Sequence, residues 1–124
     1  MAITQNNQFT AVDFRYFRDT GLTGAASRGN VFGTSGKLYS IFVNNTSGTP
    51  ATGYLKLYDT NLPVTEGTTV PSFIFKISAN VIENFTLPEG LTFSSGLGYT
   101  ISDSPGTNAG SAINAIGNLI LTFK

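Results

Sequence analysis

Apolar and polar residues alternate along many short segments of this chain, with the two-residue period of a pleated strand. The clearest case is the stretch from Gly53 to Ile77. In its first half Leu55 and Leu57 alternate with tyrosine and lysine, and in its second half Phe73 and Phe75 alternate with residues of the opposite face. A polar, proline-containing segment separates the halves. The pattern predicts a strand, a long turn and a second strand, around which the other strands are organised.

The same alternation predicts further strands along the rest of the chain. They are Phe9–Arg18, Asn30–Phe32, Leu38–Asn45, Ala79–Leu87, Leu91–Phe93, Gly96–Ser102 and Leu119–Phe123. We expect the first at a sheet edge, and Leu38–Asn45 and Leu119–Phe123 inside a sheet. Pro88–Gly90 predicts a turn between two strands. The loop Asp103–Gly110 is rich in small residues and is not expected to carry a rigid site, and Ala112–Ile116 is expected to be extended.

About seven to nine short strands at regular spacing, with no helical pattern, predict an all-β fold. We expect a two-sheet antiparallel β-sandwich, either jelly-roll-like or immunoglobulin-like. Ten phenylalanines and five tyrosines can fill the layer between the sheets. The 124 residues indicate one domain. We expect residues 1–8 to form a flexible N-terminal arm and residues 9–124 to form the sandwich.

The composition excludes several classes of chemistry. The chain has no cysteine and no histidine, so it lacks thiolate nucleophiles, the usual zinc ligands and the usual general base at neutral pH. The net charge is zero, which predicts no bulk attraction to nucleic acid or to an anionic membrane. No apolar run approaches the roughly 18 residues of a membrane-spanning helix, and residues 1–8 do not resemble a secretory signal. We expect no enzyme activity, no cofactor and no metal.

Two short motifs match known ligand-binding loops only in part. The segment Gly33–Lys37 has glycines and a lysine, but its spacing is too short for a nucleotide-binding loop and a strand follows it in place of a helix. The segment Asp59–Val70 begins like a calcium loop, but Val64 and Val70 occupy the positions of the required glycine and glutamate. We therefore predict neither a phosphate site nor a calcium site.

The first predicted strand interleaves aromatic rings with cations, which makes it a candidate partner-binding surface. Its residues are Phe14, Arg15, Tyr16, Phe17 and Arg18. Such a pattern can stack nucleic-acid bases. Asp13 and Asp19 neutralise the two arginines and no basic cluster follows, so an ordinary core-and-rim strand is the favoured interpretation.

Several segments between Lys37 and Ser102 resemble a known group of proteins. The segments are Lys37–Asn45 (KLYSIFVNN), Tyr54–Asp59 (YLKLYD), the spacing of Pro63, Gly67, Thr68 and Pro71, Leu91–Phe93 (LTF) and Gly96–Ile101 (GLGYTI). They look like parts of small virion proteins of tailed bacteriophages, including phages of cyanobacteria. The resemblance implies a structural protein of a virus particle with no enzyme activity and no cofactor, and it supplies no catalytic residues.

The expected function is therefore that of a capsid decoration (cement) protein, which binds and stabilises an assembled phage shell. The expected partners are phage capsid or tail proteins together with further copies of this chain, and the expected location is the virion, after synthesis in the host bacterial cytoplasm. Low charge and a surface rich in Thr, Ser and Asn suit close packing between proteins. No nucleic-acid or membrane partner is expected.

Two rival functions deserve a place beside this one. A tail or fibre-associated module could bind host-surface glycans by stacking Tyr54, Tyr58 and Tyr99 on sugar rings, although tyrosines at alternate strand positions are more often packed within a sheet. A glycoside hydrolase could use Glu83 and Glu89 as its carboxylate pair. Nothing in the sequence places those two carboxylates at a working separation.

Overall fold

A computed structural model describes residues 14–20, 28–111 and 116–124, with only the backbone described for residues 28–30, 116 and 117. This part of the chain forms eight strands and no helix. The strands are β1 (Arg15–Asp19), β2 (Arg28–Phe32), β3 (Gly36–Asn45), β4 (Gly53–Asp59), β5 (Phe73–Ile77), β6 (Val81–Phe93), β7 (Leu97–Ser102) and β8 (Ile116–Phe123). The predicted arm at residues 1–8, the first part of the predicted strand Phe9–Arg18 and residues 112–115 lie outside the described residues.

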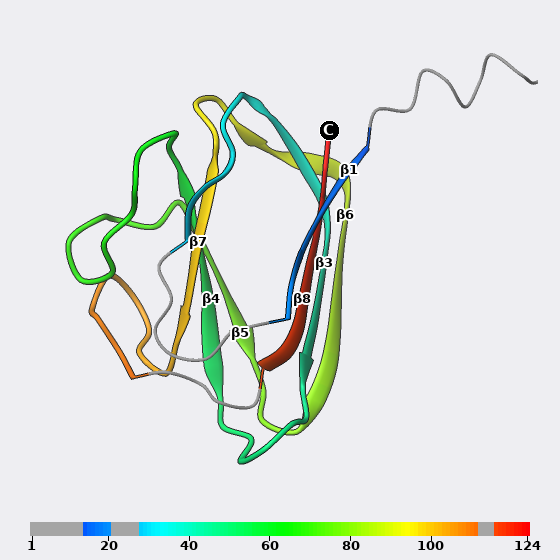
Figure 1. The fold of residues 1–124 in the computed structure, drawn as a ribbon, viewed down its shortest axis with the longest axis vertical. Coiled ribbons are helices and arrows are strands. Elements are labelled where there is room, and N and C mark those ends of the chain that lie inside the picture. Colours follow the sequence, from blue (N-terminus) through cyan, green and yellow to red (C-terminus); the bar gives the residue numbers. More distant parts are fainter. Residues whose placement is uncertain (1–13, 21–27, 112–115) are drawn as a thin grey trace, which may run out of the picture.

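The strands pair as one long antiparallel ribbon that has been rolled up. β4 pairs with β5 at its tip, and β3 with β6, β2 with β7 and β1 with β8 follow in turn. Rolling brings β8 beside β3 and β7 beside β4. The result is two four-stranded sheets, with orders β1-β8-β3-β6 (sheet 1) and β2-β7-β4-β5 (sheet 2), which face each other in Figure 1.

This strand order identifies the sandwich as a jelly roll, because its eight strands form two sheets from one folded ribbon. The immunoglobulin-like alternative has a different order. The antiparallel two-sheet sandwich predicted from the alternation is thus confirmed, as are the edge position of β1 and the interior positions of β3 and β8.

The core lies between the sheets and follows the alternation of the strands, except where the register shift of β3 between Leu38 and Ser40 interrupts it. Leu38, Ile41 and Val43 of β3 are fully buried against residues of β4, β7 and β8. Aromatic rings meet across the layer at several points. The pairs are Phe32 with Phe123, Phe73 with Phe93, Phe75 with Phe85, and Phe17 with Tyr99. These contacts lock the two sheets face to face.

The predicted turn at Pro88–Gly90 is wrong: the segment is a bulge inside the continuous strand β6. Between the pairs Leu38–Leu91 and Ser40–Thr86, β3 advances by two residues while β6 advances by five. The extra residues include Pro88, which has no N–H to donate to a ladder, and Gly90, which has a positive φ of 74°. These residues interrupt pairing as a turn would, but β3 resumes pairing with β6 beyond them.

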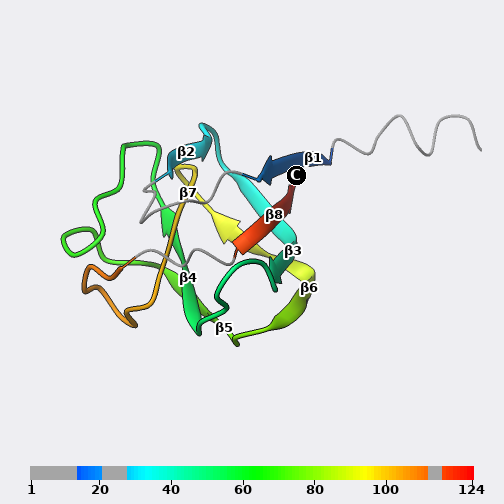
Figure 2. The same ribbon diagram turned by 60° about the horizontal axis from the view of Figure 1, so that its bottom comes forward.

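The two sheets differ in what covers their outer faces. Figures 1 and 2 show the loops 60–72 (green) and 103–111 (orange) on the outer side of sheet 2, away from sheet 1. The outward-facing Lys56, Tyr58, Thr100 and Ser102 of β4 and β7 are consequently buried. No described segment lies over the outer face of sheet 1, whose outward side chains are all exposed or half-buried.

Candidate docking surface

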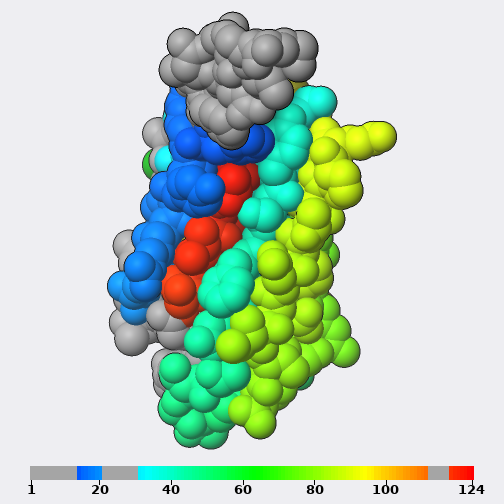
Figure 3. Space-filling model, turned by 90° about the vertical axis from the view of Figure 1, so that its right-hand side faces the viewer, coloured from blue at the N-terminus to red at the C-terminus, as the bar shows by residue number. Residues whose placement is uncertain are grey.

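The outer face of sheet 1 is one open, continuous surface. Figure 3 shows it as four neighbouring bands, β1 in blue, β8 in red, β3 in teal and β6 in yellow-green. Its central side chains are uncharged and include Ile120 and Phe42, which lie opposite each other in the register of β8 and β3. At the β6 edge Ile82 is 57% exposed. A face of this kind is available to a partner because the described chain does not cover it.

Aromatic rings gather at the end of this face where β1 begins. Tyr16 is 74% exposed and Phe14 is 38% exposed. Phe14 packs edge-on against Tyr39, with their ring centroids 5.4 Å apart. Tyr39 lies at the register shift of β3, opposite the bulge of β6, and the bulge residue Gly90 lies so close that a Cβ on it would be 3.2 Å from Tyr39. The β6 bulge therefore supports this aromatic group from one side.

Cations surround the rings. The Lys124 Nζ lies 5.4 Å from the centroid of the Phe14 ring, within the range of a cation–π contact. Lys37 and Lys124 are joined through their backbones, since each N–H donates to the other's carbonyl at 2.8 and 2.9 Å. The Arg18 Nε donates to Asn118 Oδ1 at 3.3 Å, which ties its guanidinium to β8. We call the combined set the aromatic–basic surface. It consists of Phe14, Tyr16, Arg18, Lys37, Tyr39 and Lys124.

Three of the five sequence-based candidate residues, Phe14, Tyr16 and Arg18, are exposed on this surface. Phe17 instead points between the sheets, where its ring centroid lies 5.7 Å from that of Tyr99. Arg15 is exposed but lies on the same side of β1 as Phe17, because the register pairs it with the buried Phe123.

Sequence reasoning missed Lys37, Tyr39 and Lys124 as members of this surface. They join the candidate only because β8 and β3 lie beside β1. A local pattern carries no signal of that adjacency.

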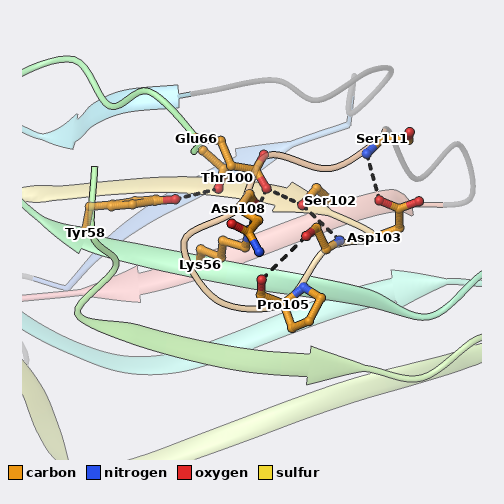
Figure 4. A network of polar contacts seen from close by, with 10 residues as sticks. Lys56, Tyr58, Glu66, Thr100, Ser102, Asp103, Pro105, Asn108 and Ser111 are labelled. Atoms are coloured by element: carbon orange, nitrogen blue, oxygen red, sulfur yellow. Dashed lines mark hydrogen bonds and ion pairs between the residues drawn. The ribbon is translucent and has the colours of Figure 1, made fainter. Parts of the chain in front are cut away.

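The opposite side of the molecule contains a buried polar network, shown in Figure 4. Lys56 is fully buried on β4, and its Nζ lies 2.6 Å from Glu66 Oε1 and 2.8 Å from the carbonyl oxygen of Asn108. The Ser102 hydroxyl donates to the same carboxylate oxygen of Glu66. Glu66 comes from the loop 60–72 and Asn108 from the loop 103–111, so the lysine joins both loops to the sheet.

Further bonds close the two loops on each other. The Gly67 N–H donates to the Thr107 carbonyl at 2.8 Å. The second loop is closed at its base, where the Asp103 N–H donates to the Ser111 carbonyl and the Ser111 N–H donates to Asp103 Oδ1 at 2.7 Å. The loop expected to be too soft for a rigid site is therefore held at several points.

The network has a structural role, because it joins the two loops to sheet 2. Next to the ion pair, Tyr58 shares a 3.0 Å hydrogen bond with Thr100. Burial raises the pKa of Tyr58, the Thr100 bond opposes this, and the charge of Glu66 raises the pKa further. Lys56 is fully buried and the side chain of Glu66 is 6% exposed, so neither presents itself to a substrate. The charges are compensated locally, as buried charges must be.

The structure argues against most residues of the glycan-binding and glycoside hydrolase alternatives. Tyr58 and Tyr99 are 1% and 0% exposed, which removes them as sugar-stacking platforms and leaves only Tyr54 half-buried at the surface. Glu83 and Glu89 lie on one extended strand, six positions apart. Glu83 precedes the bulge of β6 and the exposed Glu89 lies within it, so regular strand spacing does not bring the two carboxylates together as a glycosidase pair.

Asp59, the first residue of the segment that begins like a calcium loop, stabilises the fold. Its two carboxylate oxygens accept the N–H groups of Ser95 and Ser94 at 2.8 and 3.0 Å. Among the described residues no group of three or more His, Cys, Asp or Glu side chains could hold a metal ion. The same residues include no helix long and apolar enough to span a membrane.

Comparison of the chain with protein-family models, with curated proteins and with solved structures found no match.

Proposed function

We propose that this protein is a non-enzymatic structural protein that docks onto other proteins through the aromatic–basic surface of sheet 1. The observation that carries the proposal is the contrast between the two sheets. The chain's own loops cover the outer face of sheet 2 over β4 and β7, whereas sheet 1 leaves Tyr16 74% exposed beside Phe14. Exposed aromatic rings next to arginine are typical anchors of protein–protein interfaces.

The partner in this proposal is the assembled shell of a tailed bacteriophage, which the protein decorates and stabilises. The resemblance of Lys37–Ser102 to small virion proteins supports this choice. Jelly rolls occur in viral capsid domains and also in lectins, so the fold by itself favours neither decoration nor glycan binding. The burial of Tyr58 and Tyr99 weakens the glycan alternative. The protein is then made in the host bacterial cytoplasm, and its copies, without net charge, associate on the virion.

The decisive experiment mixes the purified protein with phage shells and tails assembled without it and images both by electron microscopy. We expect regular added density at lattice symmetry axes of the shell. Tyr16→Ala should weaken shell binding at least about tenfold, as loss of an interface anchor does. Leu62→Ala is the matched control, because Leu62 is 66% exposed on the loop 60–72, away from sheet 1.

Three outcomes contradict the proposal in different ways. Binding to tails alone moves the protein from the shell to the tail. Failure to bind either body, together with specific binding to a glycan array, replaces docking with glycan recognition. Equal losses in Tyr16→Ala and Leu62→Ala would show that the aromatic–basic surface is not the contact.

A further inference from the structure

We infer that the partner of the aromatic–basic surface is an acidic protein segment of a different chain, with aromatic or aliphatic side chains between its carboxylates. The inference deepens the proposed docking function and rests on it. It follows from three features of the described residues: where the exposed cations lie, what lies between them, and where the chain's own acidic groups are engaged.

The exposed cations are concentrated on one surface. Five basic side chains are exposed among those that the structure describes, and three of them, Arg18, Lys37 and Lys124, belong to the aromatic–basic surface. The other two are Arg15, on the core-facing side of β1, and Lys76, on β5 of the other sheet. The ion pair that the described side chains form joins Lys56 to Glu66 and includes none of these three cations. The three cations therefore favour a partner with negative charge.

The space between the cations favours apolar groups. Phe14 directly precedes β1 and Tyr16 is the second residue of β1, so their side chains, two positions apart, stand on the same side of the chain about 7 Å apart. Arg18 follows on that side, and Asn118 engages only its Nε, which leaves the terminal amino groups for a carboxylate. A segment that places an apolar side chain against Tyr16 and carboxylates at Arg18 and Lys124 satisfies both features at once.

A second copy of this chain does not supply such a segment. Two aromatic–basic surfaces placed together would oppose arginine and lysine with arginine and lysine. Four of the acidic side chains are already engaged within the fold: Asp19 by the Tyr99 hydroxyl, Asp59 by backbone N–H groups, Glu66 by Lys56, and Asp103 by Ser111. Glu83 and Glu89 are separated along β6. The described chain therefore has no acidic patch to offer, and association between copies must use another surface.

Single-stranded nucleic acid is the weaker fit. Proteins that bind it use a positively charged groove that follows several phosphates, whereas this surface has three cations and the exposed Glu89 on the adjoining bulge. The net charge of the chain is zero, so it supplies no long-range attraction for a polyanion.

The test uses the full-length protein and fluorescence polarisation of a labelled peptide with the repeat Glu-Gly-Tyr-Gly. A second peptide with glutamine in place of glutamate isolates the charge. We expect the glutamate peptide to bind at least about tenfold more tightly, and to lose most of that advantage between about 50 and 300 mM salt. The double variant Arg18→Gln/Lys124→Gln should lose the advantage, whereas Lys124→Arg should keep it. Lys76→Gln is the matched control for a lost exposed charge, and melting curves check that each variant folds.

Equal binding of the two peptides, or an equal loss in Lys76→Gln, would overturn the inference. Tighter binding of a single-stranded oligothymidine of the same charge would replace the acidic segment with nucleic acid. The proposed function is judged separately. Shell binding that is lost in Tyr16→Ala but insensitive to salt and to Arg18→Gln/Lys124→Gln would leave docking intact and reject the acidic partner. Peptide binding without shell binding would do the reverse.

Discussion

At the scale of single residues, Lys56 shows how a charged side chain is accommodated inside this protein. It lies on the face of β4 opposite to Leu55 and Leu57, a face that the alternation alone would leave to solvent. The loops 60–72 and 103–111 cover that face and bring Glu66 and the carbonyl of Asn108 to its ammonium group. The buried charge is thus compensated by residues 10 and 52 positions away along the chain.

Removing one member of this pair should be costly. Lys56→Met leaves the Glu66 carboxylate buried without its counter-charge, and we expect a loss of about 3–5 kcal/mol in the free energy of unfolding, measured in urea. Lys56→Met/Glu66→Gln removes both charges and keeps an acceptor for Ser102, so it should be more stable than Lys56→Met alone. Lys76→Met on the exposed face of β5 should change stability by less than about 0.5 kcal/mol. A double variant as unstable as the sum of its single variants would contradict this account.

Asp59 makes a pH-dependent contribution to stability. Burial raises its pKa, but hydrogen bonds from the backbone N–H groups of Ser95, Ser94 and Gly96 outweigh that effect and hold the pKa below its ordinary value. A lowered native pKa means that the folded state favours the ionised carboxylate. The contribution is therefore fully present above the unfolded pKa of about 3.9 and is lost as the pH falls through the native pKa.

We accordingly expect Asp59→Asn to be less stable than the native protein by about 1–2 kcal/mol at pH 7. The difference should shrink below about pH 4 and vanish once the native carboxyl group is protonated. Chemical unfolding at several pH values measures it. A difference that stays constant down to pH 2 would show that the charge of Asp59 contributes nothing.

Individual residues were predictable where the strand period decides their place. Leu97, Tyr99 and Ile101 are buried as the alternation indicates. Lys56 and Tyr58 could not be placed in this way, because their burial depends on loops far away in the chain. The aromatic–basic surface was predictable only in part. The local sequence pattern points to Phe14 and Tyr16, but Tyr39 and Lys124 belong to the surface only through the pairing of β1, β8 and β3.

At the scale of elements, the bulge of β6 shapes the aromatic–basic surface. Gly90 has a φ of 74°, and a Cβ added to it would lie 2.9 Å from the Lys37 Cβ. Gly106, at the tip of the loop 103–111, has a similar φ of 69°, but an added Cβ would meet nothing within 4 Å. Both glycines have a positive φ, but only an added Cβ on Gly90 would contact neighbouring atoms.

Gly106→Ala should therefore cost only the backbone strain of about 1–2 kcal/mol. Gly90→Ala adds a steric clash, and we expect a total loss of about 2–4 kcal/mol, together with weaker shell binding because Lys37 and Tyr39 must move. Thermal unfolding and the shell-binding experiment measure the two effects. Equal losses of stability in both variants would mean that the bulge relaxes without cost.

Strand existence was easier to predict than strand continuity. Pro88 and Gly90 are strong turn formers, and in the structure they interrupt the pairing of β6 with β3. Whether the chain then reverses or continues depends on a partner, and β3 is long enough to pair with β6 on both sides of the bulge. That length appears only once the two strands are aligned.

At the scale of the whole molecule, stability should be nearly flat between pH 6 and 8. The chain has no histidine, and no other side chain titrates there at its ordinary pKa. We expect a change of less than about 0.5 kcal/mol across this window, followed by a loss below about pH 4 as carboxylates are protonated. Melting curves in buffers of matched ionic strength test this. A sharp change between pH 6 and 8 would require a strongly shifted carboxylate.

The overall architecture was predictable only to the level of its class. Period-two alternation and the absence of helical patterns indicate two stacked sheets. The rolled order β1-β8-β3-β6 and β2-β7-β4-β5 was not predictable, because it is set by strand pairs far apart in the chain, such as Tyr16 with Thr122. The ribbon β4–β5 was recognised as the organising stretch, and it forms the tip from which this order is rolled.

The position of β8 has a consequence for how the protein is made. β8 follows the other seven described strands in the sequence, yet it lies between β1 and β3 in the interior of sheet 1. Until it leaves the ribosome, the nascent chain has a vacant slot beside β3, with an open edge and the apolar row Leu38, Ile41 and Val43 incompletely covered. That slot accepts a single strand. We therefore expect a fragment ending at residue 111 not to bind phage shells by itself. A separate peptide of residues 112–124 should complete the fragment by donor-strand complementation. Adding the peptide should then start shell binding.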